Sequence, residues 1–374
     1  MVEIKYKHSN FYLYMEKRAR IKLSLEDGTV YYGKSFGSET PSAGEVVFNT
    51  AMTGYPESLT DPSYRGQILC LTYPLVGNYG APAKSEENSL YKFYESSSIH
   101  IKGLIVSDYS FDYSHWNASE SLDEWLRRNN VPGIYGIDTR ALTRKIRERG
   151  VMLGKLEPEN TEIPFYDPNG LNLVEEVSTR NIKTYGSGKY KILLVDCGVK
   201  YNIIRSLLKH DVTIIRVPWN HDFTNEEYDG LFLTNGPGNP KMCDITINNI
   251  RKSFNKDIPI FGICLGNQLM ALASGADTYK LKYGHRSHNQ PVMELSSGRA
   301  YITSQNHGYA VDNDTLGKEW EPLFINLNDK TNEGMKHKGK PFFSVQFHPE
   351  ASGGPTDTAY LFNMFIEEIR RFRT

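Results

Sequence analysis

The sequence has few cysteines, and no two of them stand at a spacing typical of metal or redox sites. The four are Cys70, Cys197, Cys243 and Cys264, and their separation excludes a disulfide framework and a zinc knuckle. The N-terminus lacks a continuous apolar segment and contains Glu3 and Glu16, which disfavours a secretory signal or a transit peptide. We therefore expect a cytoplasmic protein in a reducing environment.

Long apolar runs and an excess of charge are also missing. No run approaches the roughly 18 residues that cross a bilayer, so we expect no membrane partner. The 43 lysines and arginines nearly equal the 44 acidic residues, and this balance disfavours nucleic acid as a partner. The 374 residues predict two or three domains at about 150 residues each.

The first part of the chain begins with β structure. Two β-rich runs flank the Asp27-Gly28 turn and predict a hairpin. Residues 44–80 have short apolar runs and many turn residues, so we expect loops to make up much of this stretch. Helical spacing follows at 120–129 and 139–149, the second with Asp138 or Thr139 as N-cap and Gly150 as C-cap. We leave residues 1–19 unassigned as an extension, predict a first domain over 20–180, and place a linker at 181–190.

The second domain, residues 191–374, alternates strands with helices. Apolar strands are predicted at 191–196, 212–217, 230–235 and 258–263, and a final helix at 357–372. Short β runs are expected beyond Gly284, at 300–305 and 341–347. This alternation predicts a doubly wound α/β domain with a parallel sheet.

One segment of this domain carries the pattern of a nucleophile. The apolar strand is followed by Gly262-Ile-Cys264-Leu-Gly266 and then by a helix, which is the form of a nucleophile elbow. The helix N-terminus favours a thiolate at Cys264, and the amide of Leu265 would contribute to an oxyanion hole. A lone cysteine is more often a small buried apolar residue, but strand, elbow and helix together favour a nucleophile.

A base and an orienting carboxylate are available in FFSVQFHPE. His348 follows an apolar strand, and Glu350 points to the same side two residues later. Alone, either residue is more often structural. The sequence Asn235-Gly-Pro-Gly238 ends another strand, where small residues let backbone amides approach a ligand. The ends of parallel strands meet at one edge, so these features predict one site.

These motifs resemble the class I, triad-type glutamine amidotransferases. The resemblance rests on GICLGNQ around Cys264, FHPE with His348 and Glu350, and NGPG at 235–238. Residues 44–80 and 136–150 resemble the N-terminal domain of the carbamoyl-phosphate synthetase small subunit. The segments DCGVKYN (196–202) and HNQP (288–291) are more similar to the eukaryotic, multifunctional pyrimidine-pathway type. The implied fold is an α/β amidotransferase domain preceded by a smaller β/α domain.

The resemblance implies a function and a set of site residues. Glutamine would be hydrolysed through a thioester on Cys264, and the ammonia would pass to a synthetase partner, a large subunit or a fused domain, that uses bicarbonate and ATP. No cofactor or metal is then expected in this chain, since ATP and Mg²⁺ belong to the partner. Ammonia-dependent relatives lack the elbow cysteine, which is present here. By motif match the glutamine-binding residues would be Ser63, Gly236, Gly238, Leu265, Gln268, Asn306, Gly308 and Tyr309.

Two positions depart from the family pattern. Asn267 replaces the usual His in GHQ, and Asn239 replaces the usual Asp in NGPGDP. Neither belongs to the triad, so the departures concern only local hydrogen bonds.

Three other interpretations compete with this one. Residues 28–35 match the P-loop pattern G-x-x-x-x-G-K-[ST], but a β-rich run after a turn dipeptide favours the hairpin. His285, His288 and His307 suggest a metal site, but no carboxylate or thiol stands near them in sequence, so we expect histidines in loops. The chain would otherwise be a non-catalytic docking or regulatory subunit of the synthetase.

Overall fold

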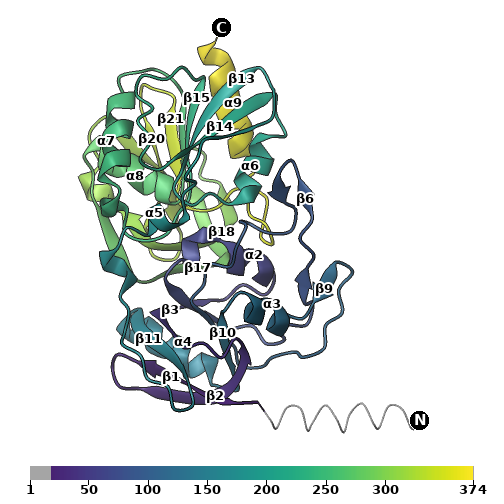
Figure 1. Ribbon diagram of the computed structural model, residues 1–374. Coiled ribbons are helices and arrows are strands. Elements are labelled where there is room, and N and C mark those ends of the chain that lie inside the picture. The colour runs from purple at the N-terminus through teal and green to yellow at the C-terminus, as the bar shows by residue number, and fades with distance from the viewer. Residues whose placement is uncertain (1–17, 374) are drawn as a thin grey trace. The chain divides into compact units, whose positions relative to one another are not determined.

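The computed structural model describes residues 18–373, which form two compact units (Figure 1). The first unit comprises residues 18–48, 66–83 and 101–167, and the second comprises 49–65, 84–100 and 168–373. The predicted linker at 181–190 therefore lies inside the second unit, and the extension at 1–19 lies almost wholly outside the described residues. Within 18–373, no helix has the length and apolar character needed to span a bilayer.

The first unit is built on a closed barrel. Its strand order is β1 (Arg20–Leu25), β11 (Met152–Pro158), β3 (Ser42–Asn49), β4 (Gln67–Leu71), β8 (Gly103–Ile105), β10 (Pro132–Tyr135) and β2 (Val30–Gly37). Strands β1 and β2 form the predicted hairpin, so residues 28–35 are a turn and a strand and not a P-loop. Helix α4 (Thr139–Arg149) has Asp138 as N-cap and Gly150 as C-cap, as predicted, and α3 (Leu122–Arg128) begins with a capping box at Ser121.

Residues 44–80 alternate short elements with loops, as their density of turn residues predicts. This stretch contains β3, α2 (Tyr55–Thr60), the 3₁₀ turn η1 (Pro62–Tyr64) and β4. Its turn residues begin these elements. Gly54 has a φ of 78° and is the N-cap of α2, and Asp61 is the N-cap of η1. Two further sheets have two strands each. One pairs β5 (Ala81–Pro82) with β9 (Ala118–Glu120), and the other pairs β6 (Glu86–Glu87) with β7 (Leu90–Tyr91).

The second unit contains a ten-stranded sheet. Its order is β12 (Lys183–Tyr185), β14 (Val212–Pro218), β13 (Tyr190–Asp196), β15 (Gly230–Leu233), β16 (Ile260–Ile263), β21 (Phe342–Val345), β20 (Asn332–His337), β19 (Trp320–Asn326), β17 (Thr278–Glu294) and β18 (Ala300–Val311). The strands from β14 to β21 pair in parallel, and those from β20 to β18 pair antiparallel. The predicted doubly wound parallel sheet is therefore confirmed for half of this sheet.

Helices cover both faces of the parallel strands (Figure 1). Helices α6 (Tyr201–Leu207) and α9 (Tyr360–Phe372) lie on one face, and α7 (Asp244–Ser253) and α8 (Leu265–Ser274) on the other. Strand β13 shows why: Ile192 and Leu194 pack with α6 and α9, whereas Leu193 and Val195 pack with α7 and α8. The remaining short helices are α5 (Leu173–Val177), η2 (Pro168–Gly170), η3 (Pro240–Met242) and η4 (Asn313–Thr315).

The prediction of loop histidines is wrong. His285 and His288 lie on β17, and His307 lies on β18. The expected β run at 300–305 is the first half of β18. Around the three histidines the strands lack a continuous apolar alternation, because several buried positions there are polar, so the sequence gives no strand signal at those residues.

Candidate active site

The turn between β16 and α8 holds Cys264 in a strained conformation. Its φ is 57° and its ψ is −104°, a combination that residues other than glycine seldom adopt. A Cβ at Gly266 would lie 2.3 Å from the Leu233 carbonyl oxygen, and one at Gly262 would lie 2.8 Å from Gly266. The two flanking glycines are therefore required, as the elbow pattern predicts. The Cys264 side chain is buried, and its Sγ lies 3.7 Å from the Asn306 carbonyl oxygen.

The predicted base and orienter form a buried pair after β21. The Nδ1 atom of His348 lies 2.7 Å from Oε1 of Glu350. Burial lowers the pKa of His348, but the Glu350 carboxylate outweighs it and raises the pKa to about 10, with a contribution from Cys264. Burial also acts on Glu350, yet Lys200 and His348 lower its pKa to about 2. The pair is therefore an imidazolium and a carboxylate near neutral pH.

A buried lysine that sequence reasoning missed completes this pair. Lys200 Nζ donates to Glu350 Oε1 at 3.0 Å, and the backbone amide of Lys200 donates to Asn235 Oδ1 at 3.1 Å. Burial lowers the pKa of Lys200, but Glu350, Glu95 and Asp61 raise it above its usual value. The only sequence signal was its place in the DCGVKYN segment, which assigns no role to it.

The segment before β4 supplies the predicted Ser63 together with a second missed residue, Asp61. Asn235 Nδ2 donates to Ser63 Oγ at 2.9 Å. Asp61 accepts from the Ser63 amide at 2.9 Å and from Asn306 Nδ2 at 2.9 Å. One carboxylate thus joins the η1 turn to β18, and all four residues belong to the second unit.

Three of the predicted glutamine-binding residues, Gly236, Gly238 and Leu265, lie in the segment that follows β15 and at the start of α8. Gly236 follows β15, and a Cβ there would lie 2.1 Å from the Cys197 carbonyl oxygen and 2.7 Å from Leu265 Cδ2. Gly238 has a φ of 84°, which favours glycine. Leu265 is the first residue of α8, where backbone amides lack intrahelical partners.

The remaining predicted residues lie on α8 and β18. Gln268 Nε2 donates to the Tyr309 carbonyl oxygen at 2.9 Å and to Gln346 Oε1 at 3.1 Å. Gly308 stands between His307 and Tyr309 on β18. The predicted glutamine-binding residues thus lie on β18, on α8, in the η1 turn and in the segment after β15, all within the second unit.

Both departures from the family pattern have satisfied hydrogen bonds. Asn267 is fully buried, donates to Gln346 Oε1 at 3.2 Å and accepts from Ser344 Oγ at 2.7 Å. Asn239 is the N-cap of η3 and accepts from the Lys241 amide at 3.1 Å. An aspartate would make the same cap.

A second group of polar side chains has the chemistry of metal ligands. His285, His307 and Glu333 are all buried, and the ligand atoms that they offer lie within 4.8 Å of one another. No carboxylate stands near these histidines in the sequence, but in the structure β20 brings Glu333 beside His285 and the turn before β20 brings Asp329.

Comparison with known proteins assigns both parts of the chain. Residues 193–368 match the family model of glutamine amidotransferase class-I, and residues 23–156 match that of the carbamoyl-phosphate synthase small chain, CPSase domain.

Named relatives agree with these models. The chain is 52% identical to human carbamoyl-phosphate synthase (ammonia), mitochondrial, and 51% identical to multifunctional protein CAD of Squalus acanthias. Each match covers 93% of this chain but only 23% and 16% of those proteins, so the chain spans less than a quarter of their length. It is also 50% identical to the arginine-specific small chain of carbamoyl phosphate synthase of Saccharomyces cerevisiae, over 93% of this chain and 88% of that protein. With these matches to both halves, the chain belongs to the carbamoyl-phosphate synthase small-chain family, with a class I glutamine amidotransferase domain.

Proposed function

We propose that this chain is the glutaminase component of a carbamoyl-phosphate synthetase. It hydrolyses L-glutamine to glutamate and ammonia and delivers the ammonia to a synthetase partner. The observation that carries the proposal is the strained Cys264 at the elbow, together with the buried His348–Glu350 pair that ends the neighbouring strand. This is the arrangement of a cysteine nucleophile with an oriented base.

The first chemical stage forms a thioester. With His348 as imidazolium, the sulfur of Cys264 attacks the side-chain amide carbon of glutamine as a thiolate. A C–S bond forms, and the carbonyl electrons move to oxygen, where the Leu265 amide stabilises the charge. As the C–N bond breaks, the nitrogen takes the proton of His348 and leaves as ammonia.

The second stage restores the enzyme. Neutral His348 accepts a proton from water, whose oxygen attacks the thioester carbon. The C–S bond breaks, glutamate is released, and the thiolate and imidazolium return. Glu350 holds the imidazole ring and its charge in place through both stages, and Lys200 holds the Glu350 carboxylate.

Substrate selection belongs to the residues around the elbow. The Asn306 carbonyl oxygen lies beside Cys264, Gln268 is bonded to the Tyr309 carbonyl on the same strand, and the Ser63 hydroxyl is bonded to Asn235 just beyond β15. Such groups fit the α-amino and α-carboxylate groups of a free amino acid.

The partner is proposed from family membership. A large subunit or a fused synthetase domain would combine the ammonia with bicarbonate and ATP, and ATP and Mg²⁺ would act on that partner. Relatives named for the arginine pathway and the relative named multifunctional protein CAD are almost equally similar to this chain, so the proposal covers either pathway.

One observation favours a second candidate, a docking or regulatory chain. Several relatives carry the word ammonia in their names, which describes synthetases that use free ammonia. The elbow cysteine of this chain favours the glutaminase. If the purified chain hydrolyses no glutamine even with its synthetase present, the docking function replaces the glutaminase.

The test is capture of the thioester. The chain is incubated with labelled glutamine, and mass spectrometry locates the label on the peptide that contains Cys264. We expect the adduct in the wild type and in Cys243→Ala, a matched control at another buried free cysteine, and none in Cys264→Ala. Glutamine hydrolysis that persists in Cys264→Ala would overturn the mechanism.

The compartment forms part of the proposal. Buried free cysteines fit a reducing cytoplasm, whereas vertebrate relatives carry the word mitochondrial in their names. Subcellular fractionation with an antibody to this chain distinguishes the two locations.

A further inference from the structure

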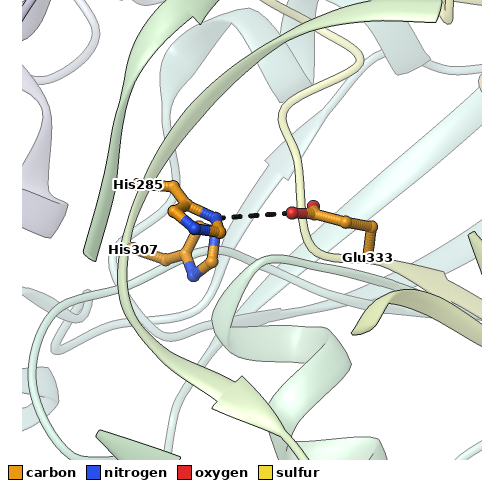
Figure 2. A group of neighbouring side chains, drawn as sticks. All are labelled: His285, His307 and Glu333. Carbon is orange, nitrogen blue, oxygen red and sulfur yellow. Dashed lines mark ion pairs between the residues drawn. The ribbon is translucent and has the colours of Figure 1, made fainter. Parts of the chain in front are cut away.

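Three buried side chains of the second unit point toward one another away from the catalytic pair. His285 of β17 and His307 of β18 are direct cross-strand partners, and Glu333 of β20 faces them. Figure 2 shows both imidazoles and the carboxylate turned to a common point. Their exposed fractions are 8%, 5% and 0%, so water satisfies little of their polarity.

The ring of His285 is oriented so that one nitrogen remains available. Its Nε2 lies 2.8 Å from Oδ2 of Asp329, which fixes a proton on that nitrogen. Its Nδ1 has no hydrogen-bond partner among the described residues and lies 3.5 Å from Oε1 of Glu333. In metal sites, a histidine that binds the ion through one ring nitrogen usually donates the N–H of the other nitrogen to a carboxylate or a carbonyl group, as His285 does to Asp329.

Both ring nitrogens of His307 face an oxygen atom, and neither neutral tautomer of the imidazole can donate a hydrogen bond to both. Its Nδ1 lies 2.8 Å from the Tyr309 carbonyl oxygen, and its Nε2 lies 3.1 Å from Oε1 of Gln305. The Gln305 amide is fixed, because its Nε2 donates to Glu333 Oε2 at 2.9 Å. A neutral imidazole has one N–H, so one ring nitrogen faces an oxygen with no proton between them.

A cation placed between Nε2 of His307 and the nearby oxygen atoms removes this conflict while the ring stays neutral. The carboxyl groups of Glu333 and Asp329 also lie beside His285, and as carboxylates they would provide the charge that a divalent ion requires.

We propose that His285 Nδ1, His307 Nε2 and Glu333 Oε1 bind a divalent transition-metal ion, with Gln305 Oε1 as a fourth donor. Two imidazoles with oxygen donors suit Zn²⁺. The 3.5 Å between His285 Nδ1 and Glu333 Oε1 is close to the edge of about 3.4 Å of a tetrahedron with Zn²⁺ bonds near 2.0–2.1 Å.

The ion would have a structural role. All donors are protein groups in a buried place, which is the pattern of a closed site without an open position for substrate. It would tie β17, β18 and β20 together next to Asn306 and Tyr309, which lie on the same strand as His307. The site does not involve Cys264, so it stands or falls separately from the glutaminase.

The experiment measures the metal content and affinity of the full chain. Protein purified without chelators is analysed by mass spectrometry of its metals, stripped, and titrated with Zn²⁺ and with Co²⁺ as a spectroscopic probe. We expect roughly one ion per chain and the strong visible absorption of tetrahedral Co²⁺. Cys264→Ala keeps both signals.

Variants assign the ligands. His285→Ala and His307→Ala abolish stoichiometric binding, and Glu333→Gln, which preserves the shape of the side chain, removes the tetrahedral Co²⁺ spectrum. Asp329→Asn weakens the affinity about 10–100-fold, because it removes the support of the His285 ring. His221→Ala is the matched control, since His221 pairs with Glu226 outside the cluster and its loss leaves binding unchanged.

Two outcomes would overturn the proposal. One is a folded wild-type chain that takes up no more Zn²⁺ than His285→Ala. The other is Zn²⁺ affinity and Co²⁺ spectra that are identical in wild type and Glu333→Gln, with folding of each variant verified by circular dichroism. His285 would then be an imidazolium paired with Asp329 and Glu333.

Discussion

The two halves of the ten-stranded sheet divide the site between them. The parallel half, β14 to β21, carries Cys264, the His348–Glu350 pair and Gly236 at or just beyond strand ends. The antiparallel half, β20 to β18, carries Asn306, Gly308 and Tyr309 within a strand, as well as the His285–His307–Glu333 cluster. In the parallel half, the side chains proposed to react, Cys264 and His348, lie in turns after strands. In the antiparallel half, the residues proposed to bind the substrate lie within a strand.

This difference explains which features can be found from sequence. A parallel strand buried on both faces appears as a short apolar run, and the turn after it is where a sheet of this kind binds its ligand. An antiparallel strand with buried polar positions shows no such pattern. We therefore expect changes in the parallel half to affect chemistry and changes in the antiparallel half to affect binding.

The largest expected effect is the loss of His348. His348→Ala should lower kcat for glutamine hydrolysis by about 10⁴-fold or more, because the base and the charge that stabilises the thiolate are both removed. Release of glutamate measures the rate, and His210→Ala, which lies outside the site, should retain it. A loss of less than tenfold would break the assignment of chemistry to the parallel half.

Glu350→Gln should follow with a loss of about 10³- to 10⁴-fold in kcat. Without the carboxylate, burial dominates and the pKa of His348 falls, so the imidazolium is lost at lower pH. The pH profile of kcat/KM in wild type and variant measures this fall. Unchanged profiles would show that Glu350 does not orient the base.

The same pair gives the folded protein a pH-dependent stability. The raised pKa of His348 stabilises the fold fully below about pH 6.5, and this contribution is lost as pH rises through about 10. The lowered pKa of Glu350 stabilises it fully above about pH 4.5, and this contribution is lost as pH falls through about 2.

Thermal unfolding across pH tests that contribution. The difference in Tm between wild type and Glu350→Gln should be largest between about pH 4.5 and 6.5 and should shrink on both sides. Glu226→Gln, at the His221–Glu226 pair on the surface, should show no comparable window. A difference that does not vary with pH would contradict the charge pair.

In the antiparallel half, Asn306→Ala should act mainly on KM. It leaves the buried Asp61 without one hydrogen bond, a loss of about 1–3 kcal/mol, whereas the backbone carbonyl near Cys264 remains. We expect KM to rise about tenfold and kcat to change less. Asn328→Ala, on the turn between β19 and β20, is the control, and a dominant fall in kcat would erase the division between the halves.

The smallest effect is expected at Asn239. Asn239→Asp keeps the N-cap of η3, so the free energy of unfolding should change by less than about 0.5 kcal/mol in denaturant titrations. A larger change in the free energy of unfolding would mean that the Asn239 side chain makes a stabilising interaction besides the N-cap of η3.

The predictable part of the molecule is the part with local signals. The elbow at Cys264 follows from two glycines between a strand and a helix, and the α4 caps follow from Asp138 and Gly150. Lys200 and Asp61 could not be assigned, because their partners Glu350 and Asn306 lie far away in the sequence. Ser63 came only from a family motif, and the carboxylate near His285 and His307 arrives through the pairing of β20 with β21.

The placement of residues 49–65 in the second unit has a consequence for attempts to divide this chain into fragments. A truncated chain that starts at residue 191 would include the elbow and the base but would omit Ser63 and Asp61. The Asn235 and Asn306 amides would then lose their acceptors in the protein interior. We therefore expect a fragment made by one cut at residue 191 to be less stable than one that keeps the η1 turn covalently attached, for example by circular permutation.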